Sequence, residues 1–132
     1  MSGVAIVNYL LSNNAGLTAV VNSAQIISGV IPVGTPQPAI SVIKISAIGR
    51  KSVSMAESNI VIERVQVTIL AKSYASAKSI LASVISALPL SKSTVNGFLC
   101  DSVLPDTEGP DIFDPDALLY MQTMDFMVRF SS

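Results

Sequence analysis

The stretch from residue 59 to residue 88 constrains the fold most, because two different hydrophobic periodicities follow one another within it. Residues 61–70 are mostly aliphatic or β-branched, and every second one falls on a single apolar face, which predicts a strand. From Tyr74 onward apolar residues recur at steps of three and four, which predicts a helix with Ser73 as its N-cap and Pro89 as its stop. The short link forces this helix back onto the sheet, so the two elements should form half of the core.

The proportion of charged residues is low. Half of the residues are hydrophobic and only 13% are charged, which is about half of the ~25% usual for soluble domains. The longest uninterrupted apolar runs fall far short of the ~20 residues that a membrane-spanning helix needs, so a membrane location is not expected. The N-terminus shows neither a basic segment nor a long apolar one, and no signal peptide is predicted. A surface covered by other subunits explains the missing charge better.

The residue inventory argues against several kinds of chemistry. The chain has no histidine and a single cysteine, Cys100, so it cannot by itself supply a usual zinc site or a histidine-dependent triad. We expect Cys100 to be a buried, inert thiol in a strand. The net charge of −1 gives no indication of nucleic-acid binding. We therefore expect no enzyme activity, no cofactor, no metal and no sequence-specific nucleic-acid partner.

The remaining periodicities complete an α+β domain that spans residues 1–132. A short helix is expected after Ser2 and a second helical turn at residues 17–21. Further strands are expected at residues 25–31, 39–48, 95–104 and 118–130. In the last of them, the apolar face should consist of even-numbered residues, namely Leu118, Tyr120, Met124, Phe126, Val128 and Phe130. This pattern predicts a mostly antiparallel sheet of four to five strands, packed on one face by the N-terminal helix and by the central helix at about 73–88. The other face should be semi-polar and suited to a solvated surface or a lumen.

One polar segment separates two apolar strands. Residues 49–58, GRKSVSMAES, carry Arg50, Lys51 and Glu57. The segment is either a solvated hairpin loop or an arm that touches a partner, since long loops without structure of their own are often functional. We keep both interpretations, and the three charged residues are candidates for interaction.

A second polar segment is acidic. The C-terminal third holds seven of the nine acids, and the candidates for interaction among them are Asp106, Glu108, Asp111, Asp114 and Asp116. A calcium loop starting at Asp106 fails, because Asp111 falls where glycine is needed. A proline-rich segment is also a poor support for a rigid catalytic carboxylate pair. We expect residues 105–116 to form an exposed acidic loop.

Bases and acids are separated along the chain, since seven of the eight bases precede residue 93. This separation suits a closed head-to-tail ring, in which two different patches of each subunit meet. We expect the acidic loop of one subunit to lie against Arg50 and Lys51 of the next, as a contact that sets orientation more than affinity.

The order of the elements resembles the small tail-completion proteins of long-tailed bacteriophages, the tail terminator or head-tail joining proteins. The resemblance covers most of the chain and rests on the opening helix followed by AGLTAVVN, on SGVIPVGTPQPAISVIKIS, on ERVQVTILAKSYASAKSILASVISAL and on FDPDALLYMQTMDFMVRF. None of these stretches is a catalytic signature, so the specificity lies in their combination. The chain departs from the usual pattern in having fewer charges on its helices.

The resemblance implies a structural virion protein at the tail–neck junction, assembled in the host cytoplasm. It would form a hexameric ring that caps the tail tube, ends tube polymerisation and offers a docking surface to the neck or connector protein. Its partners would be further copies of itself, the tail tube protein and the connector, with a lumen through which DNA can pass. The alternatives are another neck or tail-tube subunit, or a small oligomeric binding domain.

Overall fold

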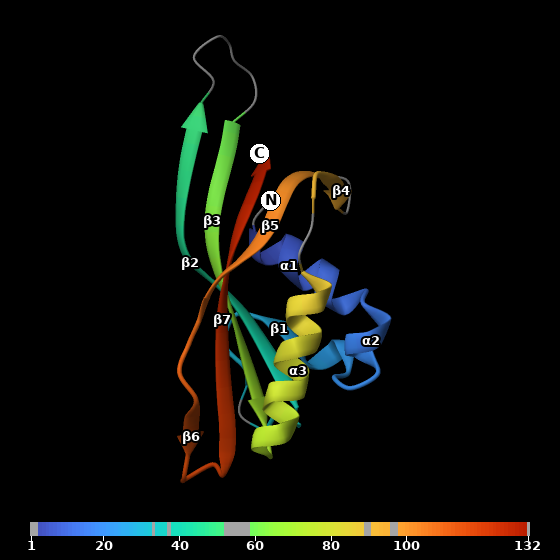
Figure 1. Ribbon diagram of the computed structural model, residues 1–132, viewed down its shortest axis with the longest axis vertical. Helices are drawn as coiled ribbons and strands as arrows, with labels where there is room; N and C mark the ends of the chain where they lie inside the picture. The colour runs from blue at the N-terminus through green and yellow to red at the C-terminus, as the bar shows by residue number, and fades with distance from the viewer. Residues whose placement is uncertain are drawn as a thin grey trace.

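The computed structural model describes residues 3–32, 34–36, 38–51, 59–88, 91–95 and 98–131. Its elements are α1 (Gly3–Ser12), α2 (Ala15–Thr18), the 3-10 turn η1 (Ser23–Gln25), β1 (Ile26–Ser28), β2 (Ala39–Lys51), β3 (Asn59–Ala71), α3 (Tyr74–Ala87), β4 (Ser93–Val95), β5 (Phe98–Glu108), β6 (Ile112–Asp114) and β7 (Leu119–Ser131). The molecule is elongated along its long strands, and the helices lie to one side of the sheet (Figure 1). The predicted α+β class is confirmed.

The sheet is larger than predicted and mixed. Its strand order is β1-β2-β3-β7-β5-β4, with β6 paired to β7, which makes seven strands instead of four or five. The long strands pair antiparallel, but β1 runs parallel to β2. The two additional strands, β4 and β6, have only three residues each. So short a segment shows no hydrophobic period, which is why the sequence pattern did not reveal them.

The central strand and helix form as predicted. In β3 the odd-numbered residues from 63 to 71 are buried, whereas the even-numbered ones are only partly so. The hydroxyl of Ser73 accepts a hydrogen bond from the backbone N–H of Ser76 and caps α3. The helix ends at Ala87, with Leu88 at its C-cap, and Pro89, predicted as its stop, lies outside the described residues. This unit supplies β3, at the centre of the sheet, and a helix that contacts β3 and β7.

One core lies between the sheet and the helices. It contains the buried side chains of α1 and α3, the odd-numbered residues of β3 and the even-numbered residues of β7. Its largest members are Phe126 and Phe130. The alternation predicted for the last strand is confirmed from Gln122 to Phe130. The predicted place of Leu118 on the apolar face is wrong, because Leu118 is 67% exposed and has a φ of 56°. Leu118 ends the turn before β7, where the strand alternation has not yet begun.

A buried carboxylate fixes the start of α1. Glu63 lies on the helix side of β3, and its Oε2 accepts a hydrogen bond of 3.0 Å from the backbone N–H of Val4. The approach is close, because a Cβ built on Gly3 would lie 2.5 Å from that oxygen. A negative group at a helix N-terminus satisfies an otherwise unpaired donor and is favoured by the helix dipole. The first helix is thereby anchored to the central strand.

Two predicted strands are divided differently. Residues 25–31 contain the end of η1 and only the short β1. Residues 95–104 do not form one strand, because β4 ends at Val95 and β5 begins at Phe98. Cys100 in β5 is buried and unpaired, as expected, and burial raises the pKa of its thiol. A thiol that is slow to ionise is a poor nucleophile, which agrees with an inert role.

Candidate interaction surfaces

The two polar segments lie at opposite ends of the subunit. Figure 1 shows the end of β2 at the top of the long axis and β6 at the bottom. The strand register agrees: Arg50 pairs with Ile60, which pairs with Ser131 at the end of β7, whereas β6 pairs with the first residues of β7. The 13 residues of β7 span about 40 Å at ~3.3 Å per residue. Within one subunit, Arg50 and Lys51 therefore lie far from β6.

The basic segment begins as a strand and not as a loop. Residues 49–51 extend β2 and pair with the first residues of β3, so the predicted loop start at Gly49 is wrong. The side chains of Arg50 and Lys51 lie outside the described part of the structure, and so does the whole of Glu57. What the structure shows is the backbone position of the two bases, at the far end of the hairpin strands.

The acidic segment is exposed, as predicted, but most of it is not a loop. Residues 105–108 belong to β5 and residues 112–114 form β6. Pro105 made a loop the favoured interpretation, but a proline is tolerated in a strand with a free edge. The five candidate acids, namely Asp106, Glu108, Asp111, Asp114 and Asp116, all lie in exposed positions.

Asp111 ties this segment to the central helix. Its carboxylate accepts hydrogen bonds from Lys78 Nζ at 2.7 Å, from the hydroxyl of Tyr74 at 2.8 Å and from the amide of Gln122. These hydrogen bonds lower the pKa of Asp111 from 3.8 to about 2, and the one from Lys78 has the largest effect, before those from Gln122 and Tyr74. Asp111 in turn raises the pKa of Lys78. The cluster joins the first turns of α3 to the segment between β5 and β6 and to β7.

An aromatic contact lies next to that cluster. The rings of Tyr74 and Tyr120 meet edge to face, with their centroids 5.9 Å apart. The ring of Phe113 is tilted against that of Tyr120, and the centroids of these two rings are 4.7 Å apart. Edge-to-face and tilted arrangements are those that aromatic pairs favour. The start of α3 and the hairpin of β6 and β7 therefore share apolar as well as polar contacts.

A second ion-pair cluster lies on the sheet face away from the helices. Arg64 donates hydrogen bonds to Asp106 and, at 3.2 Å, to Asp125, which also accepts from the amide of Gln66. Arg64 lowers the pKa of Asp106, and Asp106 raises the pKa of Arg64. Beside this cluster, Arg129 Nε lies 3.5 Å from an Asp101 oxygen. The fold thus brings Arg64 and Arg129 into ion pairs with acids that are distant in the sequence.

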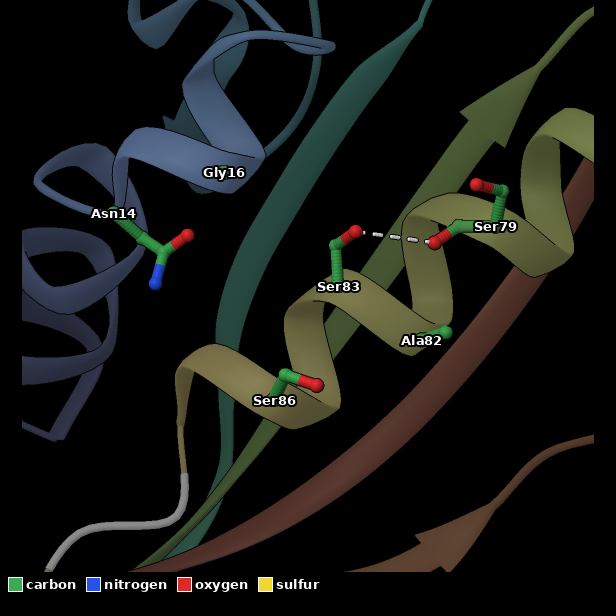
Figure 2. Close-up of a pocket in the computed structure, with 6 residues that line it drawn as sticks. All are labelled: Asn14, Gly16, Ser79, Ala82, Ser83 and Ser86. Atoms are coloured by element: carbon green, nitrogen blue, oxygen red, sulfur yellow. Dashed lines mark hydrogen bonds between the residues drawn. The ribbon is translucent and has the colours of Figure 1, made fainter.

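A depression between α2 and α3 is lined by small polar residues. It measures about 330 Å³ and is formed by Asn14, Gly16, Ser79, Ala82, Ser83 and Ser86 (Figure 2). Asn14 already accepts a hydrogen bond from the N–H of Leu17, and the Ser83 hydroxyl donates to the carbonyl of Ser79. The lining offers no charged group. The serines lie on the polar side of the helix, where the sequence places them.

The described residues contain no cluster of three or more acidic or cysteine side chains that could hold a metal ion. None of the helices in this part of the chain has the length and hydrophobicity required to cross a membrane.

The comparisons with known proteins agree with this fold. A search of curated proteins gives no match. A chain from the virion of a native gene transfer agent (GTA) particle aligns with a TM-score of 0.71 and 16% identity, over 99% of this chain and 96% of that chain. At this identity the alignment shows a shared fold. The family described as tail completion protein gp17 matches residues 5–131, nearly the whole sequence. The chain therefore belongs to the tail completion protein gp17 family.

Proposed function

We propose that the protein forms a hexameric ring on the end of a phage tail tube, stops tube polymerisation and presents a docking surface to the neck. The family match over residues 5–131 carries this proposal, because it makes the chain a structural protein of phage tails. The low charge content supports it, since a ring subunit buries surface that a monomer would keep in water. The function rests on geometry and needs no turnover.

The elongated subunit suggests how the ring is oriented. Subunits that stand side by side around an axis roughly parallel to β7 place Arg50 and Lys51 at one rim and the acidic segment at the other. A contact of Arg50 and Lys51 with the acids of β6 in the neighbouring subunit, within the contact expected from the sequence, would need a shift of about one strand length, ~40 Å. We therefore assign the two rims to two different partners.

The rim at residues 50–57 is the one that we assign to the tail tube. It includes Glu57 and the two bases, and Arg50 and Lys51 lie where the paired strands β2 and β3 end. The acidic rim is then left for the connector. Asp106 and Asp111 are already paired within the subunit, whereas Glu108, Asp114 and Asp116 form no ion pair among the described residues. Asp114 and Asp116, at the end of β6 and in the turn after it, are the carboxylates that we expect to meet the connector.

The semi-polar sheet face is the surface that we assign to the lumen. Its arginines are paired with carboxylates, so it offers DNA no cluster of unpaired cations among the described residues. Such a surface allows passage without tight binding, because affinity for DNA comes mainly from unpaired Lys and Arg. No sequence-specific recognition follows from it.

The alternative roles differ in measurable ways. A tube or neck subunit would belong to the same virion but would occur in stacks or in another copy number. A binding domain would need convergent polar groups in a pocket, and the serine-lined depression lacks a charged group. An enzyme is the weakest alternative, because a family of structural proteins does not predict catalysis.

Tube-length control tests the proposal. The purified protein is added to polymerising tail tube subunits of a related phage, and tube lengths are measured by electron microscopy. We expect growth to stop, with density at one end of each tube. Tubes that continue to elongate at saturating protein would refute a terminator role.

A further inference from the structure

Two long strand edges are unpaired in the described part of the chain. β1 pairs with β2 only at residues 40–42, and β4 pairs with β5 only at residues 98–100. Residues 44–51, here called the β2 edge, and residues 101–108, the β5 edge, therefore have a neighbouring strand on one side only. They lie at the two opposite edges of the same sheet and have the same length.

Both edges expose apolar side chains. Residues 44–49 are all exposed, with Ile45 at 48% and Ile48 at 60%, and Leu104 on the β5 edge is 55% exposed. A strand edge of this kind presents unpaired N–H and C=O groups that template pairing with another strand, and proteins usually cover or shorten such edges. Its natural occupant is a further strand.

We propose that in the ring the β2 edge of one subunit pairs with the β5 edge of the next, so that one sheet continues around the assembly. This inference rests on the proposed function for the ring itself. The directions agree, because β2, β3, β7 and β5 alternate antiparallel and β2 therefore runs opposite to β5. Rotation about an axis roughly along the strands preserves these directions and makes the new pair antiparallel.

The charges select one register. The β2 edge carries Lys44 at its start, and the β5 edge carries Glu108 at its end, so an antiparallel pair can set the two opposite each other. Lys44 pairs with buried Val65, and Glu108 pairs with buried Met124, both on the helix side of the sheet. Residues directly opposite on neighbouring strands share a face. Lys44 and Glu108 would then meet on the same face.

The same register matches the apolar residues. Counting four residues along each strand from Lys44 and Glu108 sets Ile48 opposite Leu104. Ile48 pairs with Ile62, and Leu104 pairs with Met127, on the face away from the helices. The two exposed side chains would cover each other on that face, and burial of such side chains is the term that supplies affinity.

A bulge in each strand makes this double match possible. The register shifts between Lys44 and Ser46 in β2, and between Pro105 and Thr107 in β5. A bulge moves the residues beyond it to the other face. Each strand therefore changes face within the same four-residue interval, and the local bends fall next to each other.

Pairing of like edges is disfavoured. Two β2 edges would bring together Lys44, Arg50 and Lys51 of both copies, and two β5 edges would bring together their acids. Like charges opposite each other destabilise a strand pair. The edges therefore fit a head-to-tail contact, which closes into a ring, and not a two-fold dimer.

Cysteine cross-linking tests the contact. Ile48→Cys and Leu104→Cys are made separately and together, and the oxidised proteins are separated by denaturing electrophoresis without reductant. Opposite residues of an antiparallel pair have Cα atoms ~4.5–5.5 Å apart, within disulfide range. We expect a covalent ladder up to the ring size from the double variant, and only dimers from a mixture of the two single variants.

The controls separate this inference from the ring itself. Each single variant alone should stay monomeric on the gel, because Cys100 is buried; a dimer of Ile48→Cys alone would show a two-fold contact and overturn the proposal. Hydrogen exchange of the wild type gives a second readout, with amides of residues 44–51 protected in the ring. A ring by native mass without ladder and without this protection refutes the edge pairing and leaves the proposed function standing. A wild type that forms no ring, alone or on tubes, refutes the proposed function.

Discussion

Leu81→Asp is expected to prevent the chain from folding. Leu81 lies in α3, is only 4% exposed and belongs to the core between helix and sheet. Removal of its side chain beyond Cβ, as in Leu81→Ala, costs ~2.7–5 kcal/mol through lost burial and the cavity left behind. An unpaired carboxylate in that position adds several kcal/mol more. Their sum approaches or exceeds the whole stability of a typical domain, ~5–15 kcal/mol.

The measurement compares three variants. Leu81→Asp should be recovered mainly as insoluble protein, whereas Leu81→Ala should fold with a Tm lower by roughly 10–20 °C, at about 3–5 °C per kcal/mol for a domain of this length. Ala82→Asp puts the same charge on the exposed side of the same helix and should change stability by less than ~0.5 kcal/mol. Circular dichroism melts of the soluble fractions decide the matter. A soluble Leu81→Asp that melts near the wild type would show that α3 does not pack on the sheet as described.

Three further predictions concern the two rims and the cluster at Asp111. Replacement of residues 50–57 by a short glycine linker should leave a folded subunit, because a shorter connection costs little entropy and only the last two residues of β2 are lost from the sheet. It should reduce sedimentation with tail tubes; unchanged tube binding would make this segment a mere connector. Asp114→Lys with Asp116→Lys should keep tube capping and weaken connector docking in a salt-dependent way; equal docking at low salt would remove these acids from the interface. Since the pKa of Asp111 is lowered from 3.8 to about 2 in the folded state, its stabilising effect is full above about pH 4 and is lost as the pH falls toward 2. The difference in Tm between wild type and Asp111→Asn should therefore shrink over that interval, and a constant difference would contradict the role of the charge.

The sequence predicted the elements that carry long hydrophobic periods. β3, α3 and the alternation from Gln122 to Phe130 were confirmed because each repeats its period several times. β1 was predicted as part of residues 25–31, but β4 and β6 were not, because three residues show no period. The parallel pairing of β1 depends on tertiary contacts. Leu118 was misplaced because it still belongs to the turn before β7, and the strand begins one residue later than the sequence suggests.

The candidate site was predictable in composition but not in pairing. Exposure of the acids followed from their chemistry, and the structure confirms it. The partners did not follow, because Arg64 meets Asp106 and Lys78 meets Asp111 only after β5, β6 and α3 have been placed around β7. Strand alternation could place Arg64 on the face away from the helices, but it could not show which strand lies beside it.

The central claim, that six copies of the chain close into one ring at the end of a tail tube, is tested most directly by native mass measurement of the protein alone and bound to tubes. We expect a discrete species of six copies of the 13.8 kDa chain, with one such ring per capped tube end. A mass that rises continuously with concentration, or many copies distributed along each tube, would contradict it and would identify a tube subunit instead.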